Sequence, residues 1–121
     1  MIDKCALVIE DDADIAELYR HVLDSLGFET QVIRTGEAAS VRLTETIPAV
    51  VVLDLHLSAR IGGAEILRQI RADKRLARTR VIVVTGHPEL AETVSDEADA
   101  VLIKPVDVVQ LSELIASLHP R

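Results

Sequence analysis

The chain has 121 residues, of which 49% are hydrophobic, and its 13 basic and 20 acidic residues give a formal net charge of −7. This length is typical of one domain with one core, and so large an apolar fraction excludes a disordered chain. The acidic balance argues against a protein that binds nucleic-acid phosphates, and a single cysteine excludes an internal disulfide. No apolar run is long enough for a membrane span and the first residues are not a signal peptide, so we expect a cytoplasmic domain without membrane contact.

Short apolar segments alternate with amphipathic ones along the whole chain. In chain order we predict a strand at Cys5–Ile9, a helix at Ala13–Leu26, a strand at Glu29–Arg34, a helix at Gly36–Thr46, a strand at Ala49–Leu53, a helix at Gly63–Ala72, a strand at Val81–Val84, a helix at Pro88–Val94, a strand at Val101–Ile103 and a helix at Asp107–Leu118. All the strands except the second are almost wholly apolar, which is typical of a parallel sheet covered on both faces. The more mixed second strand suits a sheet edge.

The first and last helices have the clearest apolar faces. In the first helix, apolar residues recur at spacings that place them on one side, namely Ile15, Leu18, Tyr19, Val22, Leu23 and Leu26. In the last helix, Asp107 has the place and chemistry of an N-cap. Both helices are therefore expected to pack against the sheet.

The alternation of strands and helices predicts a doubly wound α/β fold. Right-handed crossovers place helices on both faces of the sheet. Five βα units fit a five-stranded parallel sheet with the flavodoxin-like strand order 2-1-3-4-5, and residues 1–121 are expected to form one domain. In such folds the site lies beyond the carboxyl ends of strands 1 and 3.

Polar residues follow the strands at that edge. Glu10 and Asp11 follow the first strand, Asp54 the third, Thr85 the fourth and Lys104 the fifth. The three carboxylates and one ammonium leave a negative balance that a divalent cation would neutralise, and all-oxygen ligands suit Mg²⁺. A carboxylate is also a possible nucleophile that forms an aspartyl phosphate, with the hydroxyl and the ammonium binding phosphoryl oxygens. Asp54, alone at the end of the central strand, suits that role.

This set of residues, in this order and at these strand ends, resembles the receiver domains of two-component response regulators, the CheY-like superfamily. The resemblance covers essentially the whole chain. It implies that Asp54 accepts a phosphoryl group from a sensor histidine kinase or a histidine phosphotransfer domain, and that Thr85 and Lys104 bind this group. It also implies that Mg²⁺ is bound by Asp11 and Asp54 directly, by Glu10 through water, and by the backbone carbonyl of His56.

The resemblance further implies a cis peptide bond between Lys104 and Pro105. It assigns no enzymatic turnover beyond the domain's own phosphorylation and slow dephosphorylation, and no direct contact with nucleic acid. Neither a helix-turn-helix nor a basic segment follows residue 105.

Three features depart from the family pattern: the loop after the third strand, a short fourth helix of about two turns, and one residue of the fifth strand. The loop after Asp54 lacks the usual proline and is one residue longer, and we hypothesise that its Arg60 reaches the phosphoryl group. Val101 stands where an aromatic switch residue is common, so an activation signal must travel differently, or the domain mainly relays phosphate. His56 and His87 lie at positions that flank the phosphoryl group in the family and tune its lifetime; the alternative is that both are ordinary loop residues.

Two other functions stay open. One is a degenerate receiver that binds partners without phosphorylation, suggested by the altered loop, the short fourth helix and Val101. The other is a magnesium-dependent phosphatase that forms an aspartyl phosphate. Such enzymes usually carry a second acid two residues after the nucleophile, and here that residue is His56.

Overall fold

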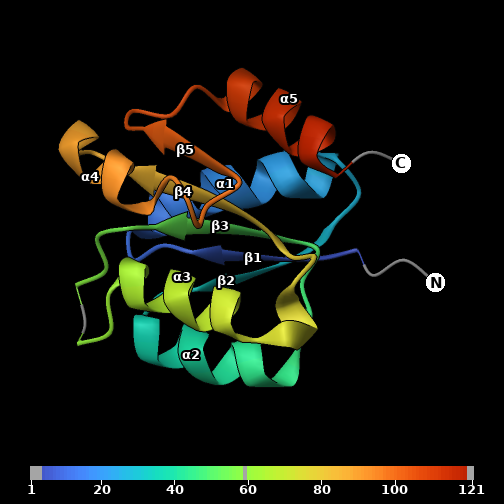
Figure 1. Ribbon diagram of the computed structural model, residues 1–121. Coiled ribbons are helices and arrows are strands. Elements are labelled where there is room, and N and C mark those ends of the chain that lie inside the picture. Colours follow the sequence, from blue (N-terminus) through green and yellow to red (C-terminus); the bar gives the residue numbers. More distant parts are fainter. Residues whose placement is uncertain (1–3, 59, 120–121) are drawn as a thin grey trace.

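The computed structural model describes residues 4–58 and 60–119. Its strands are β1 (Cys5–Ile9), β2 (Glu29–Ile33), β3 (Val50–Asp54), β4 (Arg80–Thr85) and β5 (Ala100–Ile103). Its helices are α1 (Ala13–Ser25), α2 (Gly36–Glu45), α3 (Gly63–Ala72), α4 (Pro88–Val94) and α5 (Val108–Leu118), with a short 3₁₀ helix, η1, at Lys74–Leu76. The strands are all parallel, in the order β2-β1-β3-β4-β5 (Figure 1). The predicted fold class and strand order are therefore confirmed.

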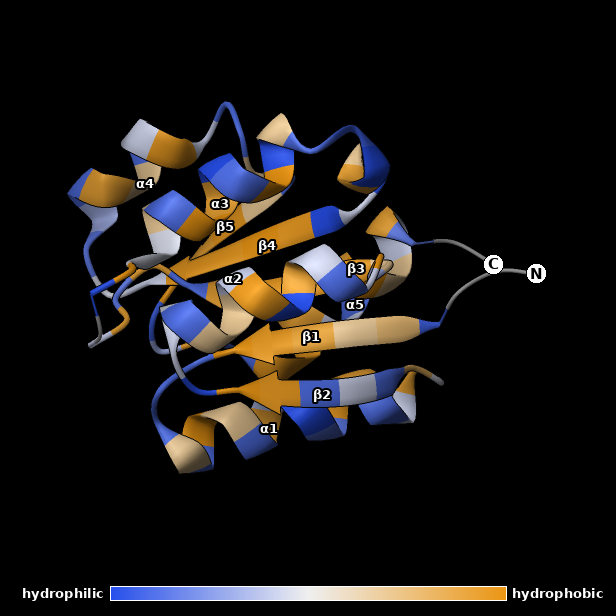
Figure 2. Ribbon diagram, turned by 90° about the horizontal axis from the view of Figure 1, so that it is seen from below, coloured by the Kyte–Doolittle hydropathy of each residue, from blue (hydrophilic) through white to orange (hydrophobic). Residues whose placement is uncertain are grey.

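Helices cover both faces of the sheet, which explains the unbroken apolar strands. Along β1, Leu7 and Ile9 face the layer formed by α2, α3 and α4, whereas Ala6 and Val8 face the layer formed by α1 and α5. All four side chains are completely buried. Figure 2 shows β1 and β4 as mostly hydrophobic, β2 as mixed, and the helices as alternating hydrophilic and hydrophobic segments. Every residue of the central strand β3 is buried, as expected for a parallel strand covered on both faces, whereas the edge strand β2 alternates exposed and more buried residues.

The apolar face of α1 differs from the prediction at one position. The helix buries Ala16, Tyr19 and Leu23, whereas Leu18 is 45% exposed. The apolar stripe of this helix is wider than the strip that contacts the sheet, and periodicity alone does not say which edge of the stripe packs. Leu18 instead lines an apolar hollow with Pro105 near the carboxyl edge of the sheet.

The element boundaries at the carboxyl edge decide where the polar residues lie. Asp54 is the last residue of β3 and pairs in register with Val84 of β4. Thr85, the next residue, is the final residue of β4. The predicted N-cap of α5 is present, because Asp107 accepts hydrogen bonds from the first turn of that helix. Asp12, which was not predicted as a cap, does the same for α1. In the part of the chain that the structure describes, no helix has the length and apolar character needed to cross a membrane.

Candidate functional site

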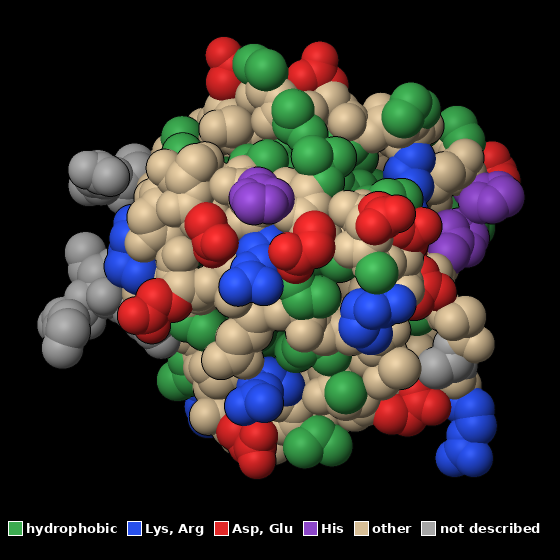
Figure 3. Space-filling model, turned by 180° about the vertical axis from the view of Figure 1, so that it is seen from behind, with side chains coloured by type: hydrophobic (Ala, Val, Ile, Leu, Met, Phe, Trp, Pro, Cys, Tyr) green, Lys and Arg blue, Asp and Glu red, His purple; other side chains and the backbone are tan. Residues whose placement is uncertain are grey.

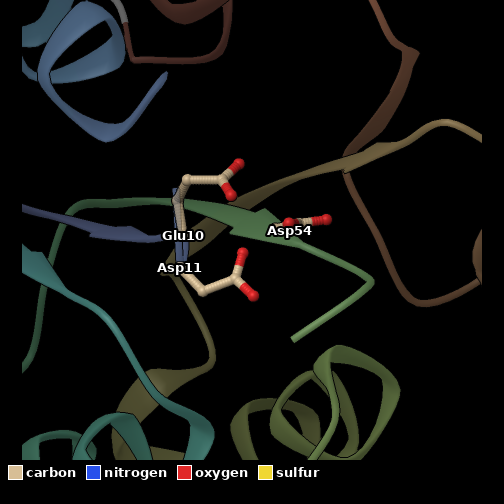
Figure 4. Close-up of side chains that lie close together, drawn as sticks. All are labelled: Glu10, Asp11 and Asp54. Carbon is tan, nitrogen blue, oxygen red and sulfur yellow. The ribbon is translucent and has the colours of Figure 1, made fainter. Parts of the chain in front are cut away.

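Three carboxylates meet at the carboxyl ends of β1 and β3. Glu10 and Asp11 directly follow β1, and Asp54 ends the neighbouring strand β3 (Figure 4). One oxygen from each of the three lies within 4.8 Å of the other two. Glu10 is 1% exposed and Asp54 is 3% exposed. Carboxylates are rarely buried to this degree without a compensating partner, which marks this edge as the candidate site.

Lys104 is the cation of this site. Its Nζ lies 3.3 Å from Oε1 of Glu10 and 3.4 Å from Oδ2 of Asp54. Burial acts to lower the pKa of Lys104, but the two carboxylates outweigh burial and raise it. The lysine therefore stays charged and bridges the two buried acids. The bond from Lys104 to Pro105 is cis, as the resemblance implied.

The pKa of Glu10 is raised by its buried place in this charge cluster. Burial, together with the neighbouring Asp54, raises its pKa to about 7, although the backbone N–H of Asp12 donates to Oε2 at 3.2 Å. A single lysine is thus insufficient to keep all three carboxylates ionised near neutral pH.

Asp11 is held from two sides. The backbone N–H of Ser58 donates to Oδ2 at 3.2 Å. Burial acts to raise the pKa of Asp11, but hydrogen bonds from Ser58 and Glu10 lower it. Nε and Nη2 of Arg34 both donate to the backbone carbonyl of Asp11, at 2.9 and 2.7 Å. Arg34 ends the segment predicted as the second strand, and no motif in the sequence marks it as a site residue.

Thr85 lies beside the acids and is completely buried. Its Oγ1 accepts the backbone N–H of His87 at 3.0 Å and lies 3.2 Å from Nε2 of His56. The backbone N–H of His56 donates to Oδ1 of Asp54 at 2.9 Å. The His56 and His87 rings contact each other, with centroids 4.5 Å apart. The sequence predicted both histidines near the site, but not the hydrogen bond between His56 and Thr85.

The loop after β3 returns tightly to the strand end. A Cβ on Gly63 would collide with the backbone carbonyl of Asp54 and lie 2.6 Å from Cα of Leu55. Arg60 is exposed and makes no hydrogen bond or ion pair with any described residue, so its approach to a phosphoryl group stays a prediction. Val101 is partly buried against the core on the α3 and α4 side, and α4 has seven residues, as predicted.

The residues present fit a bound Mg²⁺. The donors are all carboxylate oxygens, and three of them against one ammonium leave a formal charge of −2. Hard oxygen ligands in this number, with room for water, are the usual environment of Mg²⁺ in proteins.

The model of the response regulator receiver domain family matches residues 6–116. The chain belongs to this family. The receiver domain is 31% identical over 124 residues to the phosphate regulon transcriptional regulatory protein PhoB of Rhizobium meliloti, covering 100% of this chain and 54% of that protein. It is 32% identical to the DNA-binding response regulator MtrA of Mycobacterium tuberculosis, covering 95% of this chain and 49% of MtrA. The chain thus spans about half the length of these curated relatives.

A solved relative bears on the metal. The receiver domain superimposes with a TM-score of 0.85 on the response regulator TrrA of Thermotoga maritima, at 26% identity, with 96% of this chain and 99% of that chain covered. TrrA was solved in complex with Mg²⁺ and BeF. The acidic cluster of this receiver domain and the metal of its relative agree on Mg²⁺ as the cofactor.

Proposed function

We propose that this receiver domain accepts a phosphoryl group on Asp54, in a Mg²⁺-dependent reaction, from the phosphohistidine of a sensor histidine kinase or a histidine phosphotransfer domain. The observation that carries the proposal is the buried Asp54 carboxylate at the end of β3, 3.4 Å from Lys104 and grouped with two further acids. One of its oxygens accepts the His56 N–H and the other faces Lys104, so the carboxylate is oriented before any phosphoryl donor arrives.

In this proposal Glu10, Asp11, Asp54 and the backbone carbonyl of His56 hold the metal. Mg²⁺, when bound, supplies a divalent charge that offsets the acids and the phosphoryl oxygens. Lys104 pairs with one phosphoryl oxygen as a point charge. The hydroxyl of Thr85 donates a hydrogen bond to another, since Thr85 ends the strand that pairs with Asp54.

The proposed reaction is a displacement at phosphorus. A bond forms between a carboxylate oxygen of Asp54 and phosphorus as the bond from phosphorus to the histidine nitrogen breaks. The leaving nitrogen keeps the electron pair and takes a proton from water. The product is an acyl phosphate, and its slow hydrolysis returns Asp54 and inorganic phosphate. We propose no turnover of an external substrate.

The wider assignments stay proposals. We treat residues 1–121 as a single receiver domain, acting in the cytoplasm and without direct contact to nucleic acid. On the face shown in Figure 3, the described Lys and Arg side chains are interspersed with Asp and Glu and form no continuous basic patch, in accord with the last point. The transcriptional and DNA-binding roles in the names of PhoB and MtrA belong to those longer proteins.

Mass spectrometry after incubation with Mg²⁺ and acetyl phosphate tests the proposal. We expect one added phosphoryl group on the wild-type domain and none on Asp54→Asn, which keeps the shape of the side chain but not its nucleophile. Addition of EDTA should abolish the adduct. Absence of an adduct, with acetyl phosphate and with a panel of histidine kinases, would favour the binding-only receiver. Steady release of phosphate from small phosphomonoesters would favour the phosphatase.

A further inference from the structure

The buried hydroxyl of Thr85 is already engaged before any phosphoryl group is present. It accepts the backbone N–H of His87 at 3.0 Å and lies 3.2 Å from Nε2 of His56. A hydroxyl has two acceptor positions but only one hydrogen to donate. The partner of that one hydrogen therefore determines whether Thr85 is available to a phosphoryl group.

The direction of the bond to His56 follows from burial. Thr85 is completely buried, so its hydrogen requires an acceptor within the protein. Among the described residues, Nε2 of His56 is the one acceptor within hydrogen-bond distance of the hydroxyl. The Thr85 hydroxyl therefore donates to Nε2, and the neutral imidazole carries its own hydrogen on Nδ1.

We propose that this Thr85–His56 hydrogen bond is a resting-state latch that competes with the phosphoryl group for the single hydroxyl hydrogen of Thr85. The inference rests on the proposed function, in which Thr85 donates to a phosphoryl oxygen on Asp54. The latch must open for that bond to form. His56 is thus a positioning residue that acts through Thr85.

Opening the latch is feasible because the His56 side chain is on the surface. His56 is exposed, so water replaces Thr85 as the partner of Nε2 when the bond breaks. While the hydrogen bond to Thr85 is intact, the imidazole contacts the His87 ring, and the ring centroids are 4.5 Å apart. His87 directly precedes α4, and its Nδ1 lies 3.2 Å from Glu89 within that helix. The His56 and His87 rings therefore connect Thr85 to the residue that precedes α4.

His56→Phe isolates the latch. Phenylalanine keeps a ring against His87 but has no acceptor for the Thr85 hydroxyl. The backbone N–H that donates to Asp54 and the backbone carbonyl of residue 56 stay in place. His87→Phe is the matched control, because it changes the other ring of the pair and leaves the backbone N–H that Thr85 accepts.

The affinity for beryllofluoride in the presence of Mg²⁺, measured by amide NMR titration, is the readout. With the competing hydrogen bond removed, His56→Phe should bind about fivefold more tightly than wild type, the factor expected for one ordinary hydrogen bond. His87→Phe should bind like wild type. In a Thr85→Val background, His56→Phe should leave the affinity for beryllofluoride unchanged, because no hydroxyl remains to be competed for. If the ring instead had a merely structural role, its replacement would change the affinity in this background too.

A second readout is the tautomer of His56 in the domain with Mg²⁺ alone, from ¹⁵N NMR in mildly alkaline buffer. The latch requires hydrogen on Nδ1, and hydrogen on Nε2 would overturn it. If wild type takes up phosphoryl from acetyl phosphate, two further results would overturn the latch. One is an unchanged or weaker affinity of His56→Phe for beryllofluoride. The other is a gain in that affinity which persists in the Thr85→Val background. A wild-type domain that neither binds beryllofluoride nor takes up phosphoryl would instead refute the proposed function, and the latch with it.

Discussion

Gly63→Ala tests whether the loop after β3 fixes the backbone of the phosphoacceptor strand. Gly63 is the first residue of α3, and an added methyl group would collide with the carbonyl of Asp54 and lie 2.6 Å from Cα of Leu55. Carbon atoms normally stay about 3.5–4.0 Å apart, so the loop or the strand end must move by about 1 Å. Both colliding atoms belong to the backbone of the site itself, and no flexible side chain can move aside.

The magnitude follows from two opposing effects. Overpacking of this kind costs about 1–3 kcal/mol, and more when backbone must shift. Replacing glycine by alanine in a helix returns up to about 1 kcal/mol. We therefore expect a net loss of about 2 kcal/mol in the free energy of unfolding, or about 8 °C in Tm for a domain of this size.

Gly62→Ala is the matched control. The two glycines are neighbours, but a Cβ on Gly62 meets nothing within 4 Å, and its φ of −89° suits any residue. Its effect should lie within about 0.5 kcal/mol of zero, because a weaker N-cap is offset by a less flexible unfolded chain.

Urea denaturation and thermal unfolding measure both variants, and the rate of phosphoryl uptake from acetyl phosphate reports on the site. Gly63→Ala should also slow uptake, since Asp54 shares the displaced backbone. Equal stability of the two variants would refute the packing argument. A destabilised Gly63→Ala with a normal uptake rate would show instead that the strain is absorbed in α3, away from Asp54.

Three further predictions concern charge. In EDTA, the domain should lose stability as pH rises from about 4.5 towards 7, because the raised pKa of Glu10 means that the folded state holds a proton which the unfolded state releases. The loss in the free energy of unfolding approaches about 3 kcal/mol. Urea denaturation measures this profile, and Glu10→Gln or added Mg²⁺ should flatten it. Lys104→Met should slow phosphoryl uptake from acetyl phosphate about 100-fold, by removing the cation beside Asp54, and a rate near wild type would contradict its role. Arg34→Met should weaken Mg²⁺ binding about 10-fold in a titration, because the guanidinium no longer holds the carbonyl of Asp11, whereas Arg42→Met, on the exposed side of α2, should bind like wild type.

The sequence was sufficient to predict the sheet and the edge at which the site lies. Four unbroken apolar runs alternate with amphipathic segments, and this pattern has few solutions other than a parallel sheet between two helical layers. Once that topology is granted, the residues at the carboxyl ends of neighbouring strands must converge. Glu10, Asp11 and Asp54 could thus be grouped without coordinates, and the cluster in the structure agrees.

The tertiary structure alone decided how these groups interact. Lys104 contacts Glu10 across 94 positions of the chain, and Arg34 reaches Asp11 across 23. The hydrogen bond between Thr85 and His56 likewise joins the end of β4 to the loop after β3, 29 positions apart in the chain. No local pattern encodes such contacts, because each depends on the final strand register and on the path of a loop. The burial of the acids also depends on the tertiary structure. The sequence of an acidic residue after an apolar strand is the same whether its side chain is solvated or enclosed. Only the packed fold encloses Glu10 far enough to raise its pKa to about 7.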